Sequence, residues 1–165
     1  MLNKKYNFLL LKRRDILNLH FKSVNKNNRK QIELLSVAKN QAGFVESVTE
    51  CLEDAKNDKS YEPVGIYDGN TLIGFAMYGL FTDTTPSGEV WLDRLLIDEH
   101  FQSKGYGKNA ILKLLKMLKD KYKRKEVYLS VYDNNVNAIK LYKKIGFKFN
   151  GKLDINGEKI MTYEF

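Results

Sequence analysis

The segment Gln102–Lys108 places two glycines, a serine and two lysines in a spacing that suits phosphate binding. Gly105 and Gly107 let the backbone adopt φ > 0 and approach a ligand closely. A helix is predicted to begin here, and the first turn of a helix offers unpaired N–H groups that attract anions. Lys104 and Lys108 add positive charge. The segment therefore predicts a pyrophosphate site, although a plain turn before a helix has the same signature.

Two better-known phosphate loops and a metal centre do not fit this sequence. It has no Gly-Lys-Ser/Thr motif, and the third glycine of a dinucleotide-binding fingerprint is missing after Gly107. Cys51 is the single cysteine, and no Cys/His cluster has the spacing of metal ligands. We therefore expect neither a P-loop, nor a Rossmann turn, nor a bound metal.

The net charge of +8 is distributed unevenly along the chain. Residues 1–30 carry nine basic groups and one acidic group, residues 31–98 carry four and twelve, and residues 99–165 carry fifteen and seven. The middle of the chain is thus acidic, which a general nucleic-acid binder does not require. This pattern fits a protein with an anionic ligand at one end of its site and a cationic ligand at the other. Solvated charge without any ligand is the alternative.

Hydrophobic periodicity predicts the elements that position the phosphate loop. A period of two indicates a half-buried strand, and a period near 3.6 indicates an amphipathic helix. The predicted strands cover residues 17–24, 63–67, 71–80, 89–97, 126–132, 147–149 and 159–165. The predicted helices cover residues 28–38, 44–56, 107–121 and 135–145. Because strands precede, separate and follow the helices, the fold class is a mixed α/β sheet.

Length and composition indicate one globular domain. A chain of 165 residues with 43% hydrophobic residues can bury one sizeable core. No apolar run approaches the roughly 20 residues of a membrane span. The short run Phe8–Leu11 is flanked on both sides by lysine or arginine, so it does not fit a signal peptide. We expect a cytoplasmic protein.

Two motifs together resemble the GNAT superfamily of N-acetyltransferases. Gln102-x-x-Gly105-x-Gly107 is similar to that family's coenzyme A loop, and the segment Asn135–Phe147 is similar to its Asn-x-x-Ala-x-x-Leu-Tyr-x-x-x-Gly-Phe element. The resemblance covers residues 17–165 as a single domain and leaves residues 1–16 as an N-terminal extension. It implies a mostly antiparallel central sheet with helices on both faces, acetyl-CoA as the co-substrate and an amine as the acceptor.

Within the superfamily, the segments Gln41–Ser47 and Trp91–Asp98 resemble the bacterial spermine/spermidine acetyltransferase branch. The resemblance implies transfer of the acetyl group of acetyl-CoA to a primary amine of a small polyamine, by direct attack. The residues that it implies for coenzyme binding are Leu95, Leu96, Ile97, Gln102, Ser103, Lys104, Gly105, Tyr106, Gly107, Lys108, Asn135 and Ala138. Helix capping alone would also explain Asn135. Leu95-Leu96 replaces the Phe-Met of family members and leaves the backbone role intact.

Asp93 and Tyr142 are the predicted catalytic residues. A polyamine arrives protonated, with a pKa near ~10.4 by analogy with lysine, and only the neutral amine can attack. Asp93 lies two residues before Leu95, so we expect both side chains on one face of the strand, with Asp93 near the acetyl group to bind the amine or relay its proton. A structural ion pair with Arg94 or with a lysine is the alternative.

By resemblance, Tyr142 protonates the departing coenzyme A thiolate. The alternative is a core aromatic on an apolar helix stripe, and the frame formed by Asn135 and Gly146-Phe147 favours catalysis. Gln41 and Glu46 are the remaining predicted substrate-binding residues, beside Asp93. Glu50 and Glu53 continue an acidic helix face that could form a wall for a polycation.

Other functions stay open at this point. The same fold could acetylate a protein N-terminus, a lysine side chain or an amine antibiotic. A non-catalytic acetyl-CoA sensor or a nucleic-acid-binding module is a second class of alternative, but it would not require the complete loop, tyrosine and asparagine set. We expect no nucleic acid or membrane partner. The family resemblance implies a homodimer.

Overall fold

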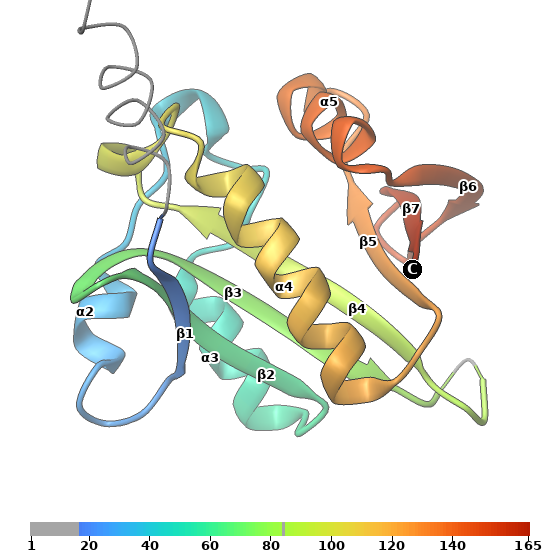
Figure 1. The fold of residues 1–165 in the computed structure, drawn as a ribbon, viewed down its shortest axis with the longest axis horizontal. Helices are drawn as coiled ribbons and strands as arrows, with labels where there is room; N and C mark the ends of the chain where they lie inside the picture. Colours follow the sequence, from blue (N-terminus) through green and yellow to red (C-terminus); the bar gives the residue numbers. More distant parts are fainter. Residues whose placement is uncertain (1–16, 84) are drawn as a thin grey trace, which may run out of the picture.

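The computed structural model describes residues 17–83 and 85–165, so the predicted N-terminal extension 1–16 lies outside the described residues. The strands form one seven-stranded sheet in the order β1-β2-β3-β4-β5-β7-β6 (Figure 1). The strands are β1 (Leu19–Ser23), β2 (Tyr61–Asp68), β3 (Thr71–Phe81), β4 (Glu89–Ile97), β5 (Glu126–Val131), β6 (Lys148–Leu153) and β7 (Lys159–Glu164). All neighbours pair antiparallel except β4 and β5, which are parallel.

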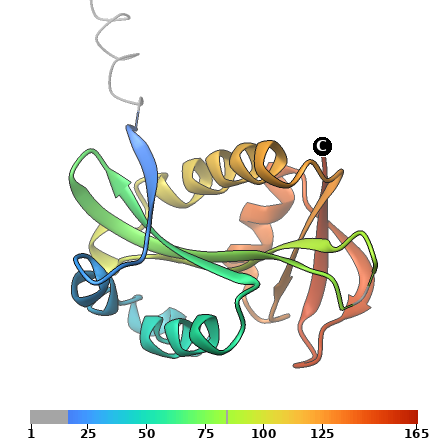
Figure 2. The ribbon, with the colours of Figure 1, turned by 90° about the horizontal axis from the view of Figure 1, so that it is seen from below.

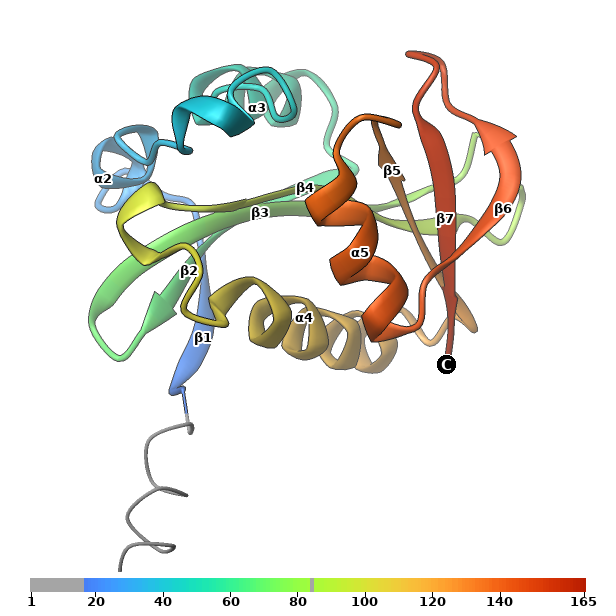
Figure 3. The same cartoon turned by 90° about the horizontal axis from the view of Figure 1, so that it is seen from above.

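Helices cover both faces of the sheet, as Figures 2 and 3 show from opposite sides. The α-helices are α2 (Arg29–Glu33), α3 (Val48–Asn57), α4 (Tyr106–Tyr122) and α5 (Val136–Ile145), and the 3₁₀ helices are η1 (Lys39–Gln41) and η2 (Glu99–Phe101). One core joins the sheet to α4 and α5, and a second joins it to α2 and α3. The predicted mixed sheet with helices on both faces is confirmed.

The two helices predicted before β2 are shorter in the structure. The first ends at Glu33, because Ser36 pairs with the end of β4 instead: its N–H donates to Asp98 Oδ2 at 3.2 Å, and its carbonyl accepts from Glu99 N at 2.8 Å. The second begins only at Val48. Ser47 and Glu50 form a capping box there, which fixes the helix start and leaves the preceding residues outside the helix.

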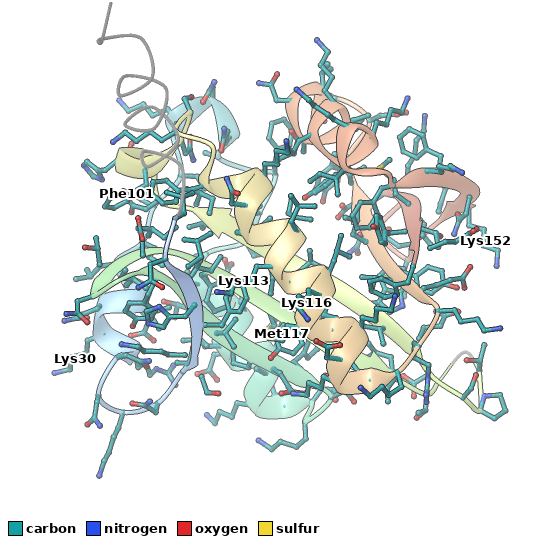
Figure 4. The ribbon with its side chains drawn as sticks, in the orientation of Figure 1. Lys30, Phe101, Lys113, Lys116, Met117 and Lys152 are labelled. Atoms are coloured by element: carbon teal, nitrogen blue, oxygen red, sulfur yellow. The ribbon has the colours of Figure 1, made fainter. Side chains whose placement is uncertain are left out.

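Helix α4 runs across the sheet and leads away from the predicted phosphate loop. Its buried residues recur at helical spacing on the side that faces the sheet, whereas Lys116 lies on the outer side, where 79% of its side chain is exposed (Figure 4). None of the helices in the described part of the chain has the length and hydropathy of a membrane span.

Replacing Leu114 with alanine should lower the free energy of unfolding by about 2–5 kcal/mol, because its fully buried side chain would leave a cavity in the core under α4. Leu112 offers a matched control on the same helix, since 43% of it is exposed. Leu112→Ala should change the free energy of unfolding by less than about 1 kcal/mol. Urea denaturation of both variants measures the difference, and equal losses would contradict the described packing of α4.

Candidate active site

A cavity of about 440 Å³ opens between the ends of β4 and β5, the first turn of α4, helix α5 and the segment that follows η1. It gathers predicted site residues that are far apart in the sequence. Those that line it are Gln41, Glu46, Asp93, Leu95, Leu96, Ile97, Gln102, Ser103, Gly105, Gly107, Lys108, Asn135, Ala138 and Tyr142. The predicted coenzyme loop, the two predicted catalytic residues and the predicted amine-binding residues therefore share one cavity.

The cavity exists because β4 and β5 separate. Their parallel pairing is restricted to Trp91 opposite Tyr128, where the two aromatic rings stack with centroids 5.5 Å apart. Beyond this point, the rest of β4 and the end of β5 line opposite sides of the cavity. Backbone groups along the diverging strands are then free to bind a ligand, since they have no ladder partner across the gap.

A β-bulge in β4 lies at Asp93. On β3, Tyr78 pairs with Leu92 and the adjacent Met77 pairs with Arg94, so Asp93 is the extra residue. The bulge reverses the alternation of side chains along β4. Leu92 and Leu95, which are an odd number of residues apart, therefore both pack against the core under α4 and α5.

This geometry corrects one expectation about Asp93. The prediction that Asp93 shares a face with Leu95 assumed an uninterrupted strand, and the bulge makes it wrong. The carboxylate of Asp93 lies with Arg94 and Glu46 instead, toward the segment before α3. It still lines the cavity, as Leu95 does.

Asp93, Arg94 and Glu46 form a linked group of charges. Arg94 Nη1 donates to Asp93 Oδ2 at 2.8 Å, and Arg94 Nε lies 2.6 Å from Glu46 Oε2 as an ion pair without hydrogen-bond geometry. Burial raises the pKa of Asp93 to about 6, although Arg94 acts to lower it; the negative charge of Glu46 raises it further. Asp93 thus forms the ion pair with Arg94 that was the alternative prediction. Its raised pKa also lets the same carboxylate exchange a proton near neutral pH.

Glu158 is a cavity residue that the sequence reasoning missed. It precedes β7, and its backbone N–H donates to Asp154 Oδ1 at 2.8 Å, which fixes the turn that presents it. Burial raises the pKa of its carboxyl, and the charges of Asp154 and Glu46 act in the same direction against Arg94. A single glutamate in a turn carries no sequence pattern, so only the folded chain shows that it shares the cavity with Glu46.

Tyr142 lines the cavity from α5. Its ring packs against Phe147 in a T-shaped contact with centroids 5.8 Å apart, so it is partly a packing residue as well. Burial raises the pKa of its phenol to about 12, and the charge of Glu158 contributes. The hydroxyl therefore stays protonated at neutral pH and has a proton to donate.

The predicted coenzyme loop has the backbone geometry of an anion site. Gly105 is the N-cap of α4 with φ +84°, and it has no side chain to cap the free N–H groups of the first helical turn. A Cβ on Gly107 would lie 3.7 Å from Leu141 Cδ2, inside the space that the cavity occupies. The absence of a side chain at both positions leaves these N–H groups accessible.

Two predicted loop residues do not reach the cavity with their side chains. Lys104 Nζ donates to the carbonyl of His100 at 2.8 Å, and the hydroxyl of Tyr106 donates to Asp68 Oδ2 at 2.8 Å. Phe101, labelled in Figure 4, lies edge-on to Tyr106. These contacts brace the loop from outside the cavity, which neither Lys104 nor Tyr106 lines.

Asn135 and Gln102 already have partners within the chain. Asn135 Oδ1 accepts from Ala138 N at 3.3 Å and caps α5, as the alternative interpretation of this residue predicted. Gln102 Nε2 donates to the carbonyl of Ile97 at 2.8 Å and to Gln41 Oε1 at 3.0 Å. Both side chains border the cavity while they hold its walls in place. Among residues 17–83 and 85–165, no group of three or more His, Cys, Asp or Glu is placed to hold a metal ion.

Comparison with known proteins agrees with this geometry. The model of the acetyltransferase (GNAT) family matches residues 27–147. The spermine/spermidine N(1)-acetyltransferase of Bacillus subtilis (strain 168) is 48% identical over 151 residues, which cover 90% of this chain and 99% of that relative.

Solved structures share the fold at lower identity. The crystal structure of spermidine N-acetyltransferase from Vibrio cholerae in complex with CoA and spermine has a TM-score of 0.68 at 22% identity, covering 89% of this chain and 95% of that one. A dodecameric structure of the Vibrio cholerae enzyme has a TM-score of 0.65 at 21% identity, covering 89% and 94%. With a family model that spans most of the described residues and a relative nearly half identical over its full length, the chain belongs to the GNAT acetyltransferase family.

Proposed function

We propose that this chain transfers the acetyl group of acetyl-CoA to a primary amine of a small polyamine of the spermidine or spermine type. The observation that carries the proposal is the cavity itself, which has helix N–H groups at one end and the carboxylates of Glu46, Asp93 and Glu158 at the other. An anionic coenzyme and a polycation suit these two ends. The activity named for the 48% identical Bacillus subtilis relative supports the same acceptor.

The residues present fit coenzyme A as a co-substrate. The first turn of α4 suits a pyrophosphate, because its N–H groups are uncapped and Gly105 and Gly107 leave room for close approach. The free edge of β4 at Leu95–Ile97 would supply backbone N–H groups to the pantetheine and the acetyl carbonyl. Amides aimed at a developing oxyanion contribute on the order of 2.7–4 kcal/mol each in other acyl transfers.

The acceptor amine must lose a proton to react. Its neutral nitrogen attacks the thioester carbonyl carbon, a C–N bond forms and the C–S bond breaks. Asp93, with its pKa raised to about 6, is the group that takes the amine proton, directly or through water. Tyr142, with its phenol protonated at neutral pH, gives a proton to the departing thiolate. Glu46 and Glu158 hold the ammonium groups that do not react.

Two residues of the predicted acidic helix face, Glu50 and Glu53, do not line the cavity. Glu46 lines the cavity, but Glu50 closes the capping box with Ser47 and Glu53 pairs with Lys56 at 3.4 Å. These last two carboxylates face solvent on α3, outside the cavity. The wall for the polyamine is therefore built from Glu46, Asp93 and Glu158 instead of from one helix face.

A thiol-release assay with acetyl-CoA and a panel of amines tests the proposal. We expect turnover with spermidine and spermine, and weak turnover with a peptide N-terminus, a lysine side chain or an aminoglycoside. Activity on peptide alone would move the acceptor to another class within the family. The predicted homodimer and cytoplasmic location stay predictions.

Tyr142→Phe should lower kcat by about 100-fold while the dissociation constant of acetyl-CoA stays within about twofold, because the change removes a proton donor and keeps the ring. Tyr163→Phe is a matched control: its ring also packs on Phe147, with centroids 5.3 Å apart, but it does not line the cavity. Steady-state kinetics and calorimetry measure both. Unchanged turnover in Tyr142→Phe would remove the phenol from the mechanism.

The pH dependence of kcat/KM should report Asp93. Its raised pKa means that the carboxylate form prevails above about pH 6 and is lost as the pH falls through that value. We therefore expect kcat/KM for spermidine to drop below about pH 6 in the wild-type protein. Asp93→Asn should have a kcat/KM at least about tenfold lower at pH 8 and should lack this break. A break of the same size in the variant would assign it to another group.

Glu158→Gln should raise KM for spermidine by about tenfold, since it removes one charged partner of the polycation. The effect on a monoamine, which has no second ammonium, should be much smaller. Glu53→Gln serves as a matched control, because Glu53 lies outside the cavity and its loss should leave both KM values unchanged. Equal effects of Glu158→Gln on the monoamine and on spermidine would rule out a role in polycation binding.

A further inference from the structure

The segment Lys39–Glu46, here called the strap, forms the wall of the cavity on the side of the proposed acceptor. Gln41, Phe44 and Glu46 are its main cavity-lining residues. The strap pairs with no strand of the sheet. Among the described residues its backbone hydrogen bonds are local ones, such as Gln41 N to Ala38 O at 2.8 Å and Phe44 N to Gln41 O at 3.2 Å. A segment of this kind depends on side-chain contacts for its position.

Three side chains fasten the strap, each to a different element. Gln41 Oε1 accepts from Gln102 Nε2 in the coenzyme loop at 3.0 Å. Phe44 packs against Tyr132 at the end of β5, with ring centroids 6.5 Å apart. Glu46 pairs with Arg94 at the bulge of β4. The strap is therefore attached to the coenzyme loop, to the end of β5 and to β4.

The attachment at Gln102 joins the two halves of the site. The same Gln102 amide nitrogen also donates to the carbonyl of Ile97, the last residue of β4. One side chain thus fixes three backbone segments relative to each other: the end of β4, the coenzyme loop and the strap. A change in the position of the loop at Gln102 would act on Gln41 through this hydrogen bond.

We propose that Gln41 is a positioning residue that couples coenzyme binding to amine binding, and that it does not itself bind the amine. The inference rests on the proposed function and deepens it. A coenzyme held by the N–H groups after Gln102 restricts the loop, and the Gln102–Gln41 hydrogen bond passes this restriction to the strap that carries Glu46. The amine then meets a carboxylate wall that is already in place.

Such coupling has a measurable and reciprocal consequence. If the coenzyme raises the affinity of the amine by some factor, the amine raises the affinity of the coenzyme by the same factor. A neutral hydrogen bond in the linkage supports a factor of about fivefold. The sequence prediction that Gln41 contacts the substrate implies a different result, namely loss of amine affinity by the same factor with and without coenzyme.

The test is calorimetric titration of spermidine into the full-length protein, with and without saturating coenzyme A, for the wild type and two variants. Gln41→Leu removes the acceptor oxygen, whereas Gln41→Glu keeps an oxygen that can accept from Gln102 Nε2. The coupling factor, the ratio of the two spermidine dissociation constants, is the readout. Because it is a ratio, an effect of the charge added in Gln41→Glu that is equal with and without coenzyme A cancels from it.

We expect a coupling factor of about five in the wild type, a factor near one in Gln41→Leu and recovery in Gln41→Glu. A wild-type factor of one, or the wild-type factor in Gln41→Leu, overturns the proposal. A variant that merely misfolds would lose coenzyme binding, so the coenzyme A dissociation constant of each amine-free variant is measured and should stay within about twofold of the wild type. Failure of spermidine to bind in either state would instead contradict the proposed acceptor.

Discussion

Between Leu92 and Arg94 the chain has one more residue than the facing strand β3 has, and this bulge at Asp93 determines where the site residues lie. It keeps Leu95 in the core under α4 and α5 while it directs the charges of Asp93 and Arg94 toward the opposite side. Strand β4 pairs with β5 at Trp91 alone, just before the bulge. The cavity, the free strand edge and the position of Asp93 therefore depend on the same short stretch of β4.

The carboxylates around Arg94 are the second constraint, and they favour a cationic ligand. Burying a charge is costly unless it is paired, and a single guanidinium here faces Asp93, Glu46 and, across the cavity, Glu158. Burial raises the pKa values of Asp93 and Glu158, and the neighbouring negative charges add to this effect. An ammonium-bearing acceptor would relieve the surplus of negative charge, whereas a neutral or anionic acceptor would not.

Much of this arrangement could be predicted from the sequence, where the information is local. The backbone freedom of Gly105 and Gly107 predicts the loop, and the hydrophobic periodicity around Leu114 predicts the helix that follows it. The late start of α3 was also readable, because Ser47 and Glu50 have the spacing of a capping box. The bulge at Asp93 and the position of Glu158 could not be predicted in this way. Strand register and the meeting of residues in one cavity depend on pairing between segments that are distant in the sequence.

The acidic and basic blocks of the sequence contribute charged residues to different ends of the cavity. The acidic middle block supplies Glu46 and Asp93 at one end, and the basic last third supplies the loop of Lys108 at the other. Gln102 and Gln41 belong to these two blocks and meet through a hydrogen bond between neutral amides. This hydrogen bond therefore connects the two charged ends of the cavity at the boundary between them.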